Sequence, residues 1–299
     1  MSFNRRKFLR ASGLMTTAAL LSLEQLLAAI EKNQSIKGWD SGSAKQGIIN
    51  DLRSKGYSLI PAPQQIKLTG KDIVVDKSWT ASLTPGKGAK ALNSLNEGAS
   101  SLHSLKFAKT GVNKIVLEVK AGTIKEKLEA NLLKQAYQLQ ISPNQVRISA
   151  DDETGLFYGV QSLLQLLRPQ GNGSFTLPEG TITDWPALDL RFIHWDTKHH
   201  QDRMETLKRY IDWSALFKAN AIAFEIEDKY EYPRHPVIGA PGAFTKKEMH
   251  ELTAYAHSRC IQLVPDVQAP AHMAYVLKHN EFARLRADGS NFQMCMCDE

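Results

Sequence analysis

The feature that most constrains the fold is an alternation of short apolar runs with amphipathic segments after Pro186. The apolar runs are typical of buried strands, and the segments between them have the 3.6-residue spacing of helices. Expected strands and helices alternate over Leu190–Trp195, Met204–Lys218, Asn220–Ile226, Thr245–Ser258 and Ile261–Val267. Thr245 is a favourable N-cap for the second helix. This order predicts parallel βα units.

Polar residues follow each of these strands, as they do in (β/α)8 barrels, where active-site groups lie at the carboxyl ends of the strands. A whole barrel needs roughly 250 residues, and roughly three βα units fit into residues 181–299. The sequence therefore predicts an α/β fold in which residues 181–299 form the first part of a TIM barrel.

The region before residue 181 is predicted to form a separate α+β domain. Short alternating segments at 66–68, 73–75 and 114–120 predict strands, and 136–141 with 145–150 predict a hairpin around Ser142-Pro143-Asn144. Helical spacing covers Lys87–Leu105 and Thr154–Leu167. From this pattern alone the domain ends near Gly173. The domain prediction as a whole is 59–180.

The amino terminus resembles a twin-arginine export signal. Arg5 and Arg6 precede Phe8-Leu9, and a mostly apolar run extends from Gly13 to Leu23. We expect residues 1–30 to act as a signal or anchor and residues 31–58 to form a leader rich in Gly, Ser and Lys. The expected location is the periplasm or cell envelope, with membrane contact only through an uncleaved signal.

Composition excludes some other classes. A chain of 299 residues with 42% hydrophobic and 23% charged residues is ordinary for a soluble globular protein. The formal charge of +6 is spread along the chain rather than gathered in a basic motif, so no nucleic-acid partner is predicted. Cys260 is expected to be a buried small hydrophobe. Cys295 and Cys297 supply half of a metal site at most, so no metal or other cofactor is predicted.

Several segments recur in the order found in one enzyme family. "LIPAPQQI", "AYQLQISPNQVRISADDETGLFYGVQSLLQLL" and "LPEGTITDWPALDLR" resemble the domain that precedes the barrel in glycoside hydrolase family 20, the β-N-acetylhexosaminidases. The resemblance covers roughly residues 59–184. It implies that this domain supports the barrel without a catalytic role. Tyr158 and Gly159 are accordingly interpreted as packing residues.

The first barrel strand resembles the family's first strand at three positions. Arg191 matches an arginine that binds sugar hydroxyls, Asp196 matches an aspartate five residues later, and His200 matches the following histidine. A bidentate guanidinium suits vicinal hydroxyls. The family's glycine and second arginine are replaced here by Phe192 and His199.

Arg191 also has a structural interpretation, an ion pair with Asp184 or Asp189 at the barrel floor.

The second strand ends in "FEIEDKYEYP", which resembles the hexosaminidase D branch of the family. Side chains alternate along a strand, so Glu225 and Glu227 are expected to share a face while Asp228 points to the opposite one. Glu227 and Asp228 are candidate substrate-binding residues. The alternative is a solvated loop at the mouth of the barrel.

The third strand is followed by "PDVQAPAH", which resembles the family pattern Pro-Glu-Ile-Asp-x-Pro-Gly-His. His272 falls on the family histidine, and the resemblance implies that it couples to Asp196 and tunes the pKa of the catalytic glutamic acid. Gln268 replaces the family aspartate, as it does in the hexosaminidase D branch. Ala271 replaces the glycine.

The mechanism that the resemblance implies is substrate-assisted, retaining removal of a terminal β-linked N-acetylhexosamine. The 2-acetamido carbonyl attacks C1, an Asp orients the amide, and the adjacent Glu protonates the leaving oxygen. This Asp-Glu pair lies in a His-x-Gly-x-Asp-Glu segment, which the 299 residues do not contain, and Asp298-Glu299 follows no strand. We expect a chain truncated before its catalytic pair. Its supporting residues are Asp196 and His272, and its partner is an N-acetylhexosamine-containing glycan. A non-catalytic or degenerate amino-sugar-binding relative is the alternative.

Overall fold

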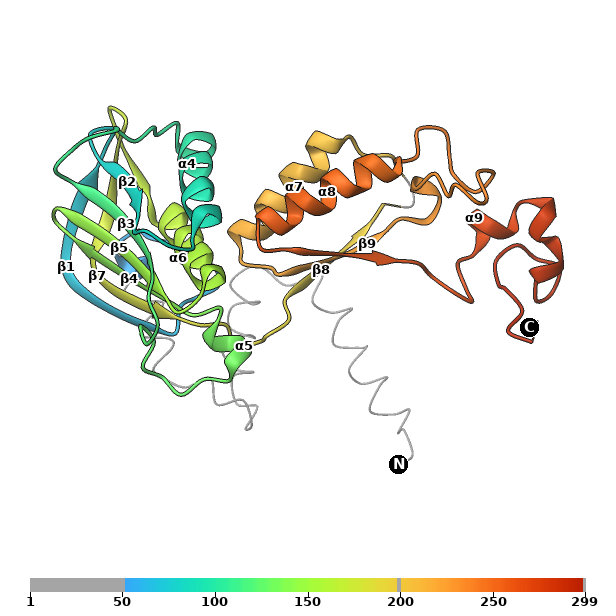
Figure 1. Ribbon diagram of the computed structural model, residues 1–299, viewed down its shortest axis with the longest axis horizontal. Coiled ribbons are helices and arrows are strands. Elements are labelled where there is room, and N and C mark those ends of the chain that lie inside the picture. The colour runs from blue at the N-terminus through green and yellow to red at the C-terminus, as the bar shows by residue number, and fades with distance from the viewer. Residues whose placement is uncertain (1–51, 198–199, 298–299) are drawn as a thin grey trace, which may run out of the picture. The chain divides into compact units, whose positions relative to one another are not determined.

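The computed structural model describes residues 52–197 and 200–297, which contain two β-sheets with their covering helices (Figure 1). The predicted export signal and the leader up to residue 51 lie outside this range. In the described part of the chain no helix is both long enough and apolar enough to cross a membrane.

The first sheet is mixed and has seven strands. Its order is β1-β7-β4-β5-β3-β2, with β6 paired to β7. The strands are β1 (Gln65–Val75), β2 (Thr80–Leu83), β3 (Lys114–Val119), β4 (Tyr137–Ser142), β5 (Gln145–Ala150), β6 (Arg168–Gly171) and β7 (Ser174–Asp184). The predicted hairpin is confirmed, because β4 and β5 pair antiparallel from Tyr137↔Ala150 to Ser142↔Gln145.

Two helices lie along one face of this sheet (Figure 1). They are α4 (Ala89–His103) and α6 (Glu153–Leu166), and a short α5 (Ala130–Leu133) precedes β4. The Asp152 side chain caps α6 by accepting a hydrogen bond from the Thr154 N–H. Most of α6 is buried against the strands and α4, which confirms the two predicted helices and the packing interpretation of Tyr158 and Gly159.

The secondary structure of this region extends past the predicted domain limits, which themselves stay a prediction. β7 lies between β1 and β4 and ends at Asp184, beyond both Gly173 and residue 180. The segment Pro178-Glu179-Gly180 in its middle hides the strand pattern. At the other end, Leu52 and Tyr57 belong to the hydrophobic core, so residues 52–58 are packed rather than part of a leader.

Gly155 stands where α6 touches the strand backbone. A Cβ at this position would lie 2.1 Å from the carbonyl oxygen of Ala136. We expect Gly155→Ala to lower the free energy of unfolding by about 1–3 kcal/mol, because the backbone has to shift. Urea unfolding measures it, with Asn93→Ala at an exposed α4 position as control. Equal unfolding midpoints for the two variants would contradict the close approach.

The second sheet consists of three parallel strands in the order β10-β9-β8. The strands are β8 (Phe192–Asp196), β9 (Ala221–Glu225) and β10 (Gln262–Asp266), and the connecting helices are α7 (Met204–Leu216) and α8 (Lys246–Ser258). Thr245 forms the expected N-cap, with a reciprocal capping box to Glu248. The predicted parallel βα units are therefore confirmed.

Helices α7 and α8 run along one side of this sheet (Figure 1). Ile222 and Phe224 are fully buried there, and Trp195 makes edge-to-face contacts with Tyr210 of α7 and with Phe224. Side chains alternate between the faces, so His194 and Ala223 belong to the opposite face. After β9 and β10 the chain forms η3 (Glu227–Lys229), α9 (Ala274–Leu277) and η4 (Asn280–Leu285).

Candidate active site at the strand ends

Three carboxylates end the three parallel strands in register. Asp196 on β8 pairs with Glu225 on β9, and Glu225 pairs with Asp266 on β10. In-register residues of parallel strands point to the same face, here the face opposite α7 and α8. Glu225 is 0% exposed. The carboxyl ends of the strands therefore form an acidic row where a barrel enzyme places its active site.

His194 lies on the same face, two residues before Asp196. Its Nε2 is 3.2 Å from a carboxylate oxygen of Glu225 and 3.4 Å from a carboxylate oxygen of Asp266. Neighbouring strands are about 4.8 Å apart, so His194 on β8 meets Asp266 on β10 only by lying across β9. The residue beside it on β9 is Ala223, whose methyl group leaves that space open.

The two carboxylates determine which nitrogen of the His194 imidazole donates a hydrogen bond. An ionised carboxylate only accepts hydrogen bonds, so Nε2 has to carry a proton. In the neutral imidazole, Nδ1 is then an acceptor. The His194 side chain is 45% exposed, and that of Asp266 is 37% exposed. The pair is thus held in place at the carboxyl ends of the strands, the end at which barrel enzymes bind their ligands.

The segment after β9 corrects one prediction. β9 ends at Glu225, and Glu227–Lys229 form a 3-10 turn, so strand alternation does not place Glu225 and Glu227 on one face. Glu227 is buried with φ of 32°, and its carbonyl accepts a 2.7 Å hydrogen bond from the Tyr232 hydroxyl. Positive φ is unusual for a side-chain-bearing residue and is frequent at functional sites.

Asp228 lies between two cations. Its carboxylate is 2.7 Å from the Lys229 ammonium and 3.6 Å from that of Lys278. The 3-10 turn also contacts α9, where burial and then the nearby Glu227 charge raise the pKa of Tyr275. The loops after β9 and β10 therefore meet, which brings Glu227 and Asp228 to one side of the site.

His272 and His200 lie on loops that follow strands. His272 has φ of 60° and an edge-to-face contact with Phe292 at 4.9 Å between ring centroids. His200 pairs with Asp202 at 3.0 Å. The coupling of Asp196 to His272 and the sugar contact of His200 stay predictions.

Arg191 lies just before β8, at the end of the strand opposite to Asp196. Its guanidinium donates to the carbonyls of Lys218, Leu188 and Asp189 and to the Gln135 side-chain oxygen, over 2.8–3.1 Å. It also stacks over the Tyr158 ring at 5.3 Å. This geometry favours a structural role for Arg191 over the sugar contact. The predicted ion pair takes another form, because Asp189 contributes its carbonyl and Asp184 pairs with Lys218.

Beside Arg191 is a buried polar cluster that joins the two sheets. The Lys218 ammonium is 3.1 Å from the Asp184 carboxylate and 2.9 Å from the Tyr137 hydroxyl, which also bonds Asp184 and Ser162. Burial lowers the pKa of Lys218, opposed by the Asp184 charge, and burial raises the pKa of Tyr137. These partners fix the end of α7 on the first domain.

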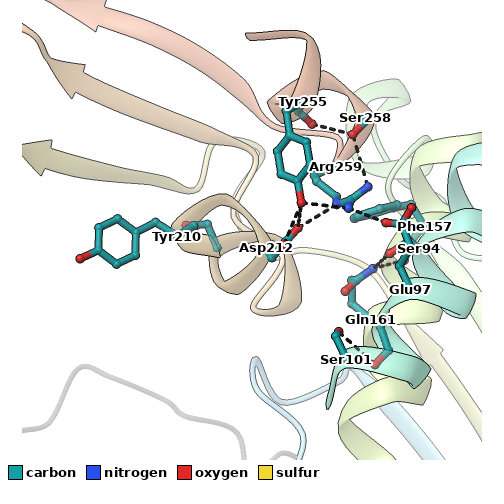
Figure 2. A network of polar contacts seen from close by, with 12 residues as sticks. Ser94, Glu97, Ser101, Phe157, Gln161, Tyr210, Asp212, Tyr255, Ser258 and Arg259 are labelled. Atoms are coloured by element: carbon teal, nitrogen blue, oxygen red, sulfur yellow. Dashed lines mark hydrogen bonds and ion pairs between the residues drawn. The ribbon is translucent and has the colours of Figure 1, made fainter. Parts of the chain in front are cut away.

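A second joint holds α8 (Figure 2). Arg259, just after α8, donates to Asp212 of α7 at 2.8 Å and to Glu97 of α4 at 2.5 Å, and its guanidinium lies 4.6 Å from the Tyr255 ring centroid. Figure 2 shows Tyr255 and Arg259 converging on Asp212. Both joints lie away from the carboxyl ends of the strands, and they hold the barrel strands in position.

Within residues 52–197 and 200–297, no group of three or more His, Cys, Asp or Glu side chains could hold a metal ion. Cys260 is largely buried, and burial raises its thiol pKa to about 12. That environment suits the predicted packing role for Cys260, because a reactive thiol needs a lowered pKa.

Two family profiles match the chain in succession. "Glycosyl hydrolase family 20, domain 2" matches residues 56–185, and "Glycosyl hydrolase family 20, catalytic domain" matches residues 189–296. The chain belongs to glycosyl hydrolase family 20. The two matches fall on the seven-stranded and three-stranded sheets, so the acidic row lies in the part that matches the family's catalytic domain.

Proteins similar to this family 20 chain include several hexosaminidases. A beta-hexosaminidase of Vibrio vulnificus is 27% identical over 189 residues, which cover 52% of this chain and 22% of that protein. A mutant beta-hexosaminidase of Streptomyces plicatus, solved in complex with its product GlcNAc, is 25% identical with a TM-score of 0.66, covering 81% of this chain and 53% of that one.

A Vibrio harveyi family 20 exo beta-N-acetylglucosaminidase, solved with N-acetylglucosamine, shares the fold at 20% identity and a TM-score of 0.66, covering 79% of this chain and 42% of that one. The neighbours are consistent with a partial TIM barrel for residues after β7. The chain spans less than two thirds of the length of each of these relatives.

Three residues of the site were not predicted as candidates from the sequence: His194, Glu225 and Asp266. The sequence nevertheless contains a signal for them. Each of these residues lies at or near the end of a predicted parallel strand, and His194 and Asp196 share a face by alternation. The strand register that brings Asp266 to His194 was not readable from the sequence.

Proposed function

We propose that the protein removes terminal β-linked N-acetylhexosamine from glycans by substrate-assisted, retaining hydrolysis. The observation that carries the proposal is the acidic row Asp196, Glu225 and Asp266 with His194 at the strand ends of the family 20 catalytic domain. A row of carboxylates and one imidazole at the strand ends suits a ligand rich in hydroxyl groups, since carboxylates accept the hydroxyl hydrogens.

In this proposal the described residues bind and orient the sugar. Asp196 and His272 support the acid catalyst, and Glu227, Asp228 and His200 contact the sugar from the loops. The catalytic Asp-Glu pair comes from a further barrel strand that the 299 residues do not include. The acetamido carbonyl of the substrate is the nucleophile at C1, so the protein has to supply an acid and an orienting carboxylate. Residues 1–30 are proposed to direct export of the protein to the cell envelope.

The test compares two aryl glycosides on two proteins. The product of the complete gene is expected to hydrolyse 4-nitrophenyl N-acetyl-β-glucosaminide and to leave the corresponding β-glucoside intact, because the glucoside lacks the nucleophilic amide. The 299-residue chain is expected to release no nitrophenol from either substrate. Equal turnover of both glycosides by the gene product, or turnover by the 299-residue chain, would contradict the proposal.

A calorimetric titration distinguishes the hydrolase hypothesis from its alternative, a non-catalytic amino-sugar-binding relative. A degenerate relative would bind N-acetylglucosamine without hydrolysing it. If the complete gene product binds the sugar but releases no nitrophenol, the hydrolase hypothesis is wrong and the protein is an amino-sugar-binding relative.

A further inference from the structure

The face of the three-stranded sheet opposite α7 and α8 has layers set by register. Phe192 lies beside Ala221, His194 beside Ala223, and Asp196 beside Glu225. On β10 the same layers hold Gln262, Val264 and Asp266. The middle strand therefore carries two alanines below its glutamate. Large side chains on β8 are free to extend over β9 toward β10.

The His194 side chain occupies this space. It extends over Ala223, and its imidazole contacts the carboxylates of Glu225 and Asp266. Glu225 is wholly buried and so fixes the ring rather than meeting a ligand. Asp266 ends β10, and its carboxylate lies 3.4 Å from Nε2 of His194. The two groups form one hydrogen-bonding unit at the carboxyl ends of the strands, where barrel enzymes bind their ligands.

We infer that His194 and Asp266 together bind a ring hydroxyl of the N-acetylhexosamine. The small side chain of Ala223, between them on β9, leaves the space in which the two groups make contact. This inference rests on the proposed function. The Asp266 carboxylate accepts a hydrogen bond from a sugar hydroxyl, and Nδ1 of His194 accepts one from the hydroxyl in the neutral imidazole or donates one to it in the imidazolium. The guanidinium of Arg191 donates its hydrogen bonds to protein acceptors at the other end of β8. Arg191 therefore does not bind this hydroxyl.

The experiment pairs protein variants with altered sugars. The 299-residue chain is titrated calorimetrically with N-acetylglucosamine and with its 3-deoxy, 4-deoxy and 6-deoxy analogues. One missing hydroxyl is expected to weaken binding to the wild-type chain about tenfold, the usual magnitude for one hydrogen bond to a charged or strongly polar group. In His194→Phe that penalty is expected to shrink to about half or less, because the imidazole nitrogen is gone and only the Asp266 carboxylate is left to meet the hydroxyl.

Two further variants separate recognition from folding. Ala223→Leu is expected to weaken N-acetylglucosamine binding about tenfold by pushing the imidazole off its carboxylates, with both nitrogens still present. His250→Phe makes the same chemical change at an exposed position on α8 and is expected to bind like the wild-type chain. Circular dichroism melting of each variant shows whether it is folded.

The outcomes are distinct. A wild-type chain that binds no N-acetylglucosamine would overturn this inference, while the proposed function is decided separately by the complete gene product and the two aryl glycosides. A wild-type chain that binds, with the same deoxy-sugar penalties in folded His194→Phe, would overturn the inference alone and leave the proposed function standing. Loss of the penalty in both His194→Phe and His250→Phe would also overturn it.

Discussion

Replacing Lys218 by methionine is expected to lower the free energy of unfolding by about 3–5 kcal/mol. The substitution leaves the Asp184 carboxylate buried without its cation. Both side chains are less than 10% exposed, and their oxygen and nitrogen atoms lie 3.1 Å apart. Removing one partner of such a pair is more costly than the pair is stabilising, because the remaining charge stays out of water. Urea unfolding followed by tryptophan fluorescence measures the effect.

A double-mutant cycle tests the cause. Asp184→Asn removes the charge but keeps one acceptor oxygen for the Gln64 N–H, while its NH2 group can donate to the Tyr137 hydroxyl, which bonds the other carboxylate oxygen in the native chain. Adding Asp184→Asn to Lys218→Met is expected to restore part of the lost stability, with a coupling energy of at least about 1 kcal/mol. Additive effects of the two substitutions would show that the charge pair is not what is lost.

Arg191→Ala is the second substitution with a large expected effect, a loss of about 2–4 kcal/mol of unfolding free energy. Four hydrogen bonds from a charged donor disappear, each worth about 1–3 kcal/mol before relaxation and water offset part of the loss. Gln135 is buried and loses a partner for its side-chain oxygen. Thermal and urea unfolding measure the change.

Arg191→Lys is the matched variant. A lysine ammonium cannot place donors on three separate backbone carbonyls and a side-chain oxygen, so most of the loss is expected to persist. If Arg191→Ala instead left unfolding unchanged and weakened N-acetylglucosamine binding tenfold or more, the guanidinium would serve the sugar, as the family resemblance implied.

The fold was largely predictable because local signals agreed with the packed structure. Thr245 and Glu248 form the capping box at the start of α8, and the hairpin of β4 and β5 follows strict alternation. β7 was missed because Pro178-Glu179-Gly180 interrupts its pattern, although its hydrogen bonds to β1 and β4 place it inside the sheet. Such pairing over long sequence separations leaves no local trace.

The site was less predictable than the fold. The sequence pattern proposed Asp196 and the loop residues Glu227 and Asp228, which stay predictions, and it extended β9 beyond Glu225, after which Glu227–Lys229 form a 3-10 turn. It assigned Arg191 to sugar because a guanidinium suits hydroxyls, whereas the structure surrounds it with protein acceptors. His194 stands out only once the register of three strands is known.

The central claim is that the three parallel strands begin a family 20 barrel whose later part supplies the catalytic pair. Reading the coding sequence past the codon for Glu299 tests this claim most directly. We predict further alternating strands and helices, including a strand that ends in a His-x-Gly-x-Asp-Glu segment. A stop codon directly after Glu299, or a continuing reading frame without an Asp-Glu pair at a strand end, would contradict the hydrolase account.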